Sequence, residues 1–176
     1  MDKLIEIFLE EPEKEFYVRE LSRDLKKSPT TVSKYLKELE EKGILESEKK
    51  FNHLFFKANT EKEAFKQLKI NYNLKKIKES GIISFLIGEF NEPRAVVLFG
   101  SFAKGENIKT SDIDLLVITP LKKEINLERF ESEVGHKIQL FLFSNKELEK
   151  MKEKNKELLN SFINGAILYG FVEMFK

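Results

Sequence analysis

The sequence predicts an α+β protein in which a small, mostly helical region ending in a β-hairpin precedes a region of mixed strands and helices. Three observations indicate this fold class. Apolar residues recur at helical spacing over residues 4–39. Two β-rich runs flank a polar turn within residues 44–57. After residue 93, short strands of the buried type alternate with helical segments, which predicts a small mixed sheet flanked by helices.

The length and composition set the scale of this fold. The chain has 176 residues, enough for one domain or two small ones. We expect a first domain over residues 1–60, a helical connector over 61–92 and a second domain over 93–176. No apolar run approaches the ~20 residues of a membrane span, and the N-terminus is too charged for a signal peptide. We therefore expect a cytoplasmic protein without a membrane partner.

End signals delimit the helices of the first domain. The first helix is expected to end before Pro12. A short second helix covers residues 18–25. Ser28 is a good N-cap and Pro29 suits the first helical position, so a third helix is predicted to begin there. It is expected to stop near Gly43.

A hairpin and a helical connector follow. Residues 44–47 and 53–57 are expected to pair as strands around a polar turn at residues 48–52. Helical periodicity then runs from about residue 61 to residue 90, with a break at Ser80-Gly81.

The second domain is predicted to begin with a buried strand over residues 95–99, followed by a Gly-Ser turn. Two more strands are expected over residues 112–118 and 137–143, with a helix over 127–134 between them. The tail from residue 145 reads as mostly helical, with a final edge strand near residues 166–169.

Composition restricts the chemistry that this chain can carry out. The absence of cysteine excludes disulfides and thiolate metal sites, and the two histidines, His53 and His136, are too few for a zinc cluster. Carboxylates remain as candidate metal ligands, and they favour Mg²⁺ or Mn²⁺. The net charge is +1, so any nucleic-acid binding must come from a local basic patch.

The strongest functional motif joins the Gly-Ser turn to a pair of aspartates. Gly100 lets the backbone approach a ligand closely, Ser101 adds a hydroxyl donor and Lys104 adds a cation. In the strand that follows Ser111, alternation puts Asp112 and Asp114 on one face. Two adjacent carboxylates repel each other unless a cation lies between them. The alternative is a structural turn whose aspartates merely face water.

This run resembles the signature of the DNA polymerase beta-type nucleotidyltransferase superfamily, especially its minimal members. The resemblance covers roughly residues 94–143. It implies that Gly100 and Ser101, with Lys104 and Ser111, bind a nucleoside triphosphate. It also implies that Asp112 and Asp114 are catalytic and ligate Mg²⁺ or Mn²⁺.

The chain departs from the family pattern at the third acid, where the next strand carries Gln139. A glutamine has no charge and cannot accept a proton, so the attacking hydroxyl loses a potential general base, worth about 10²–10⁴ in rate. Glu131, Glu133 and His136 are nearby substitutes in sequence, but surface glutamates are more often simply solvated. Whether the chain is an enzyme is therefore left open.

The second and third helices resemble a helix-turn-helix, and the hairpin resembles the wing of MarR- and ArsR-like winged-helix regulators. Between residues 26 and 37 the charged residues are four lysines and no acid. The alternative is a winged helix used only for packing or dimerisation. The candidate DNA contacts are Lys27, Thr30, Thr31, Ser33, Lys34, Lys37, Lys49 and Lys50.

Three functions remain in view. The favoured one is a DNA-binding, regulatory protein whose second domain binds Mg²⁺-NTP and transfers NMP weakly. The first alternative is an active nucleotidyltransferase that modifies a hydroxyl of a small molecule, protein or RNA, with the winged helix as its docking module. The second is an inactive interaction protein of toxin–antitoxin type. Winged-helix proteins often dimerise, but no feature of the sequence requires a homodimer.

Overall fold

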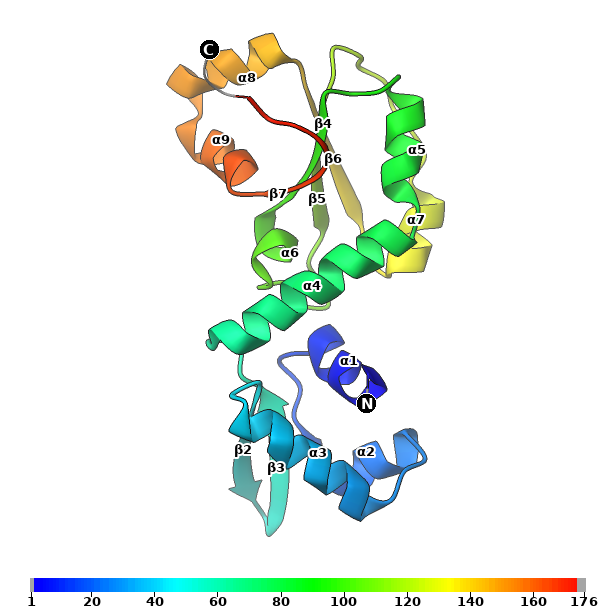
Figure 1. The fold of residues 1–176 in the computed structure, drawn as a ribbon, viewed down its shortest axis with the longest axis vertical. Coiled ribbons are helices and arrows are strands. Elements are labelled where there is room, and N and C mark those ends of the chain that lie inside the picture. The colour runs from blue at the N-terminus through cyan, green and yellow to red at the C-terminus, as the bar shows by residue number, and fades with distance from the viewer. Residues whose placement is uncertain (1, 174–176) are drawn as a thin grey trace. The chain divides into compact units, whose positions relative to one another are not determined.

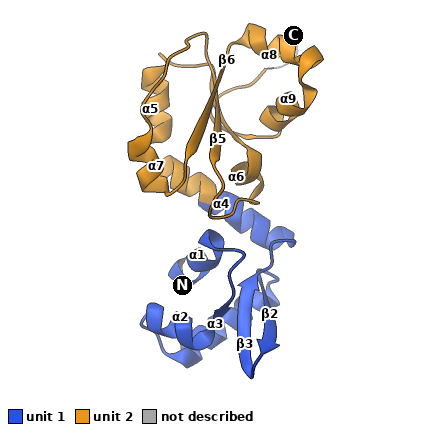
Figure 2. Cartoon of the chain, turned by 180° about the vertical axis from the view of Figure 1, so that it is seen from behind, with its two compact units in different colours: residues 1–72 blue, residues 73–176 orange. Residues whose placement is uncertain are grey.

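The computed structural model describes residues 2–173 and divides into two compact units, residues 1–72 and 73–176 (Figure 1, Figure 2). The boundary falls inside helix α4 (Glu63–Glu79). Phe65 and Tyr72, in the first part of α4, pack into the core of unit 1. Leu74 and Ile77, in its last part, belong to the core of unit 2.

Unit 1 contains the predicted helices and hairpin. Its elements are α1 (Asp2–Glu10), β1 (Phe16–Tyr17), α2 (Val18–Asp24), α3 (Pro29–Glu41), β2 (Leu45–Lys50) and β3 (His53–Ala58). Ser28 caps α3, as predicted, because its side chain accepts the backbone N–H of Thr31 at 3.1 Å. The three helices pack around the wholly buried side chains of Phe8, Leu21 and Leu36.

Two features of this sheet differ from the sequence-based expectation. The strands of the hairpin are longer, and the turn is only Phe51-Asn52, rather than the whole of residues 48–52. In addition, β1 adds a third strand through the antiparallel pair Phe16↔Phe56, giving the order β1-β3-β2. A two-residue strand has no periodicity of its own, so only its pairing partner reveals it.

Unit 2 is built around a four-stranded sheet of order β6-β5-β4-β7. Strands β5 and β6 run parallel, while β4 is antiparallel to both β5 and β7. This arrangement confirms the predicted small mixed sheet, with β7 at one edge. The elements are α5 (Ile82–Glu89), β4 (Ala95–Phe99), α6 (Gly100–Lys104), β5 (Ile113–Ile118), α7 (Glu128–Val134), β6 (Ile138–Phe143), α8 (Asn145–Lys154), α9 (Lys156–Ile163) and β7 (Ala166–Gly170).

Helices cover both faces of this sheet. Figure 1 shows α5 and α7 on one side and α8 and α9 on the other. Alternation along β4 sends Val96 and Leu98 into the first layer, whereas Val97 and Phe99 enter the second. All five residues of β4 are buried, so the strand is a rigid base for the turn that follows it. No helix in the described part of the chain is long and apolar enough to cross a membrane.

Candidate functional site

The turn after β4 lies directly against a carboxylate. Gly100 begins the five-residue helix α6 and has φ +71°, a conformation that side-chain-bearing residues rarely adopt. A Cβ built on Gly100 would lie 2.3 Å from Oδ2 of Asp114 and 3.2 Å from its Cγ. The backbone of this turn and the acid therefore come within a distance that only glycine permits.

The second acid and Gln139 lie at the same end of the sheet. In β5, Asp114 is paired with Phe99 on one side and with Gln139 on the other. Asp112 lies just before β5, and its Oδ2 accepts a hydrogen bond from Nε2 of Gln139 at 2.7 Å. Burial, together with the charge of Asp112, raises the pKa of Asp114. The tertiary structure thus gathers the Gly-Ser turn, both aspartates and the third-acid position.

Ser111 supports the approach to this acid pair. Its Oγ accepts the backbone N–H of Ile108 at 3.0 Å, which closes a tight turn before Asp112. Its carbonyl oxygen lies 2.9 Å from Nδ1 of His136, whose ring meets Phe102 edge to face. Ser111 and His136 therefore hold the chain that leads into Asp112. Sequence reasoning weighed His136 as a base and missed this positioning contact.

The remaining predicted ligand-binding residues lie on α6. Ser101 is half-buried in its first turn, and its carbonyl oxygen accepts the backbone N–H of Glu106 at 2.9 Å. Lys104, in the last turn, is exposed. Both follow directly from the turn that approaches Asp114.

A buried asparagine, which the sequence analysis did not single out, anchors α6. Asn73 on α4 is 2% exposed, and its Nδ2 donates to the carbonyl oxygen of Phe102 at 2.9 Å. The same nitrogen donates to Oδ1 of Asn107, itself 3% exposed, at 2.7 Å. These bonds fasten both α6 and the loop that leads to Asp112. A polar residue within a helical run gives no local signal of such a role.

Two protein carboxylates are the ligands that this site offers a metal. The described residues contain no cluster of three or more acidic, histidine or cysteine side chains placed to hold an ion. Mg²⁺ is often bound through only one or two carboxylates, with phosphate oxygens and water completing its octahedron. Burial is the larger cause of the raised pKa of Asp114, and a cation would also relieve the second cause, which is repulsion from Asp112. The donor set therefore fits a divalent ion that arrives with a nucleotide.

Neither of the two neighbouring glutamates joins the acid pair. The Glu131 carboxylate accepts a hydrogen bond from Nζ of Lys137 at 2.6 Å and another from the backbone N–H of Ile138 at 3.0 Å. These hydrogen bonds lower the pKa of Glu131 and hold its carboxylate ionised. Glu133 is exposed on α7.

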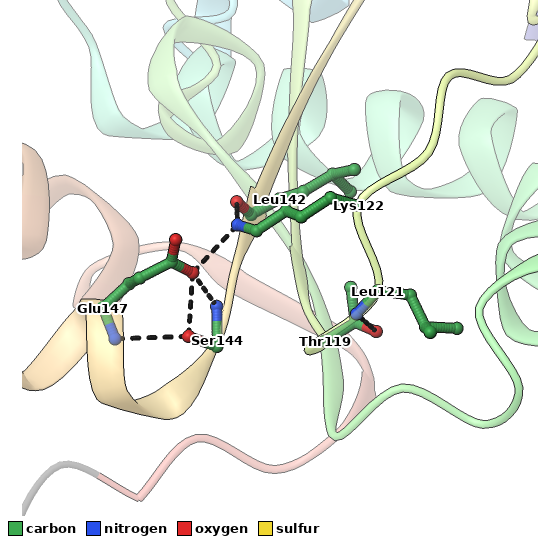
Figure 3. A network of polar contacts seen from close by, with 6 residues as sticks. All are labelled: Thr119, Leu121, Lys122, Leu142, Ser144 and Glu147. Atoms are coloured by element: carbon green, nitrogen blue, oxygen red, sulfur yellow. Dashed lines mark hydrogen bonds and ion pairs between the residues drawn. The ribbon is translucent and has the colours of Figure 1, made fainter.

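The opposite end of the sheet carries a cavity of about 800 Å³ that lacks the acid pair. Figure 3 shows a network of polar contacts on the wall of this cavity. In it, Oε2 of Glu147 accepts hydrogen bonds from Nζ of Lys122 at 2.8 Å and from the backbone N–H of Ser144 at 2.6 Å. These bonds lower the pKa of Glu147 to about 2. Its carboxylate is thus engaged in capping α8 and holding the loop after β5, which is a structural role.

In unit 1, the structure separates the predicted DNA contacts into two groups. Those with exposed side chains are Lys27, Thr30, Thr31, Lys34, Lys37 and Lys49. Oγ1 of Thr31 also lies 2.8 Å from Oγ of Ser28. The other two, Ser33 and Lys50, are half-buried. Lys50 differs most from expectation, because its Nζ lies 2.6 Å from Glu15 and 3.0 Å from Glu48. Both hydrogen bonds raise the pKa of Lys50.

Comparison with known proteins finds a separate family match within each of the two units. Residues 80–163 match the family model of the nucleotidyltransferase domain. Residues 4–47 match that of the bacterial regulatory proteins of the arsR family. The first match includes the Gly-Ser turn, both aspartates and Gln139, and the second runs from α1 into β2. No curated protein and no solved structure matches the chain.

Proposed function

We propose that this chain, which joins an arsR-family helix-turn-helix domain to a nucleotidyltransferase domain, is a DNA-binding regulator that binds Mg²⁺-NTP and transfers NMP at most slowly. Nucleotide binding is assigned to unit 2, and DNA binding to α3 and the hairpin of unit 1. ATP is the nucleotide with which we would begin.

The close approach of Gly100 to Asp114 carries the nucleotide part of this proposal. The turn requires glycine, and the Asp114 carboxylate beside it is partly buried next to a second negative charge, which is unfavourable without a cation. Both are accounted for if the turn supplies N–H groups to phosphate while Asp112 and Asp114 hold the metal that accompanies it. When bound, the metal would neutralise charge on the polyphosphate and polarise the reacting phosphorus.

Gln139 is the reason for proposing slow transfer. Its amide donates to Asp112, so in this arrangement it adds neither negative charge nor a proton acceptor to the site. Glu131, the nearest replacement in sequence, is held by Lys137 and a backbone N–H. An attacking hydroxyl would therefore lack a general base from these residues, while binding through the two aspartates would survive.

The DNA part rests on the exposed face of α3. Lys34 and Lys37 are exposed on this helix, and Lys27 is exposed just before it. Lys34 forms only a weak surface pair with Glu38, at 4.0 Å. Thr30 lies in the first turn, where recognition helices contact base edges.

An active nucleotidyltransferase that uses unit 1 for docking is the second candidate, because both aspartates are retained. The third, an inactive interaction protein, is disfavoured by the same pair: an unused site has no need to keep two repelling carboxylates together.

The test is calorimetric titration of ATP into the protein with Mg²⁺. Asp112→Asn with Asp114→Asn should abolish Mg²⁺-dependent binding. The matched control, Glu149→Gln with Glu153→Gln, removes the same charge from exposed positions on α8 and should bind like the wild type. Unchanged affinity in the aspartate variant would remove the metal assignment, provided that circular dichroism shows both variants folded.

A further inference from the structure

The tip of the β2–β3 hairpin presents an aromatic ring to solvent. Phe51 and Asn52 form the two-residue turn, and the side chain of Phe51 is 95% exposed. Both views show this hairpin projecting from the helices of unit 1 (Figure 1, Figure 2). Phe51 is absent from the packed core of the unit, so the fold gains no burial from it.

The backbone of Phe51 adds a second cost. Its φ is +47° and that of Asn52 is +62°. Two-residue hairpin turns of this kind favour Asn, Asp or Gly at both positions, and a bulky aromatic residue with positive φ is an outlier. A residue that is both strained and exposed is not explained by stability. Such outliers concentrate at binding sites, where the strain is part of the function.

Charge at the hairpin is largely cancelled. Lys50 is held between Glu15 and Glu48, which leaves Lys49 as the exposed lysine next to the turn. Attraction of phosphate by the hairpin tip is therefore weakened, because one of the two lysines beside the turn already has two acidic partners. What the tip offers a ligand is mainly the apolar ring of Phe51.

We propose that Phe51 inserts as an apolar wedge between base pairs in the DNA minor groove when α3 occupies the major groove. This inference rests on the DNA-binding part of the proposed function. A helix fits the ~12 Å major groove, whereas a narrow tip with one ring suits the ~6 Å minor groove. Apolar side chains inserted there unstack a base step and bend the duplex. Flexible pyrimidine–purine steps, such as TA, yield most easily and should be preferred.

The test uses two short duplexes of equal composition, one with a central TA step and one with an AA step. Anisotropy titrations across a salt series give affinity and its salt slope, and energy transfer between end labels reports bending. Phe51→Ala should weaken binding to the TA duplex about tenfold, since stacking of one base on an aromatic ring has about this effect. It should also abolish the bend and leave the salt slope unchanged, because no phosphate contact is lost.

Two further variants make the outcome specific. Phe51→Leu keeps an apolar wedge and should retain most of the bend. Lys34→Ala with Lys37→Ala should weaken binding to both duplexes and flatten the salt slope. Because Phe51 is exposed, its variants should melt like the wild type.

The failures are distinguishable. If no duplex binds even at low salt, both the DNA function and the wedge are wrong. If the lysine variant weakens binding but Phe51→Ala leaves affinity and bend unchanged, only the wedge is wrong. A changed oligomeric state of Phe51→Ala on size-exclusion chromatography, with DNA bending intact, would overturn the wedge and assign the ring to self-association.

Discussion

Replacing Gly100 with alanine tests the geometry on which the nucleotide site depends. The added Cβ would lie 2.3 Å from Oδ2 of Asp114, closer than real Cβ contacts allow. Either the Asp114 side chain must rotate away or the turn after β4 must move. Both changes separate the acid from the Gly-Ser turn, so Gly100→Ala should lose both stability and Mg²⁺-ATP affinity.

The expected loss of stability in Gly100→Ala has two parts, and another glycine of the chain provides a control for one of them. An L-residue in the left-handed region costs about 1–2 kcal/mol. Gly135 has the same φ of +71°, but an added Cβ there meets nothing within 4 Å. Gly135→Ala should therefore show only this backbone cost. Gly100→Ala should lose about 1–3 kcal/mol more, the usual range for overpacking a tight site.

Chemical denaturation followed by circular dichroism, without divalent ions, measures both variants. In the double variant Gly100→Ala/Asp114→Ala the crowding carboxylate is gone, so Gly100→Ala should then cost no more than Gly135→Ala. This double-mutant cycle isolates the contact from the backbone strain. Equal losses in Gly100→Ala and Gly135→Ala, or no recovery in the double variant, would refute the proposed contact.

Three other substitutions test the missing general base, the anchor of α6 and a hydrogen bond within unit 1. Gln139→Asp should raise NMP transfer from labelled ATP, by up to about 10²–10⁴ if a general base is what limits the reaction. Gln139→Asn should not, and no gain with Asp would point to another missing element. Asn73→Leu leaves two buried acceptors without their donor, so denaturation should show a loss of about 1–3 kcal/mol for each, with weaker Mg²⁺-ATP binding. Tyr72→Phe removes a 2.7 Å hydrogen bond to Glu10 and should cost about 1 kcal/mol at neutral pH. Burial and this bond raise the pKa of Tyr72 above its ordinary 10.0, so the wild-type contribution is complete below pH 10.0 and declines as the pH rises through the raised value. The variant should lack that alkaline decline, and a parallel pH profile would contradict this reasoning.

Elements whose signals are local were predictable from the sequence. The N-cap at Ser28 and the break at Ser80-Gly81 involve residues only a few positions apart, and the structure has both. The strands of unit 2 were also predictable, because burial on both faces leaves near-continuous apolar runs such as the one over residues 95–99. The Gly-Ser and Asp-x-Asp motif also identified the candidate site, because its residues lie close together in one segment of the sequence.

Features that depend on partners far along the chain required the tertiary structure. The pairing of Lys50 with Glu15 joins residues 35 positions apart, and it gives an acidic partner to a lysine that was predicted to contact DNA. The bonds of Asn73 to α6 and to the loop beyond it span 29 and 34 positions.

The sequence by itself determined which residues are available to bind a metal, a phosphate or DNA, because residue type and local periodicity are properties of the chain. Only the tertiary structure decided which of those groups meet. Gly100 faces Asp114, and Gln139 reaches Asp112, because antiparallel β4 and parallel β6 align on either side of β5. Strand register is a global balance of buried area and hydrogen bonding, and no local segment contains it.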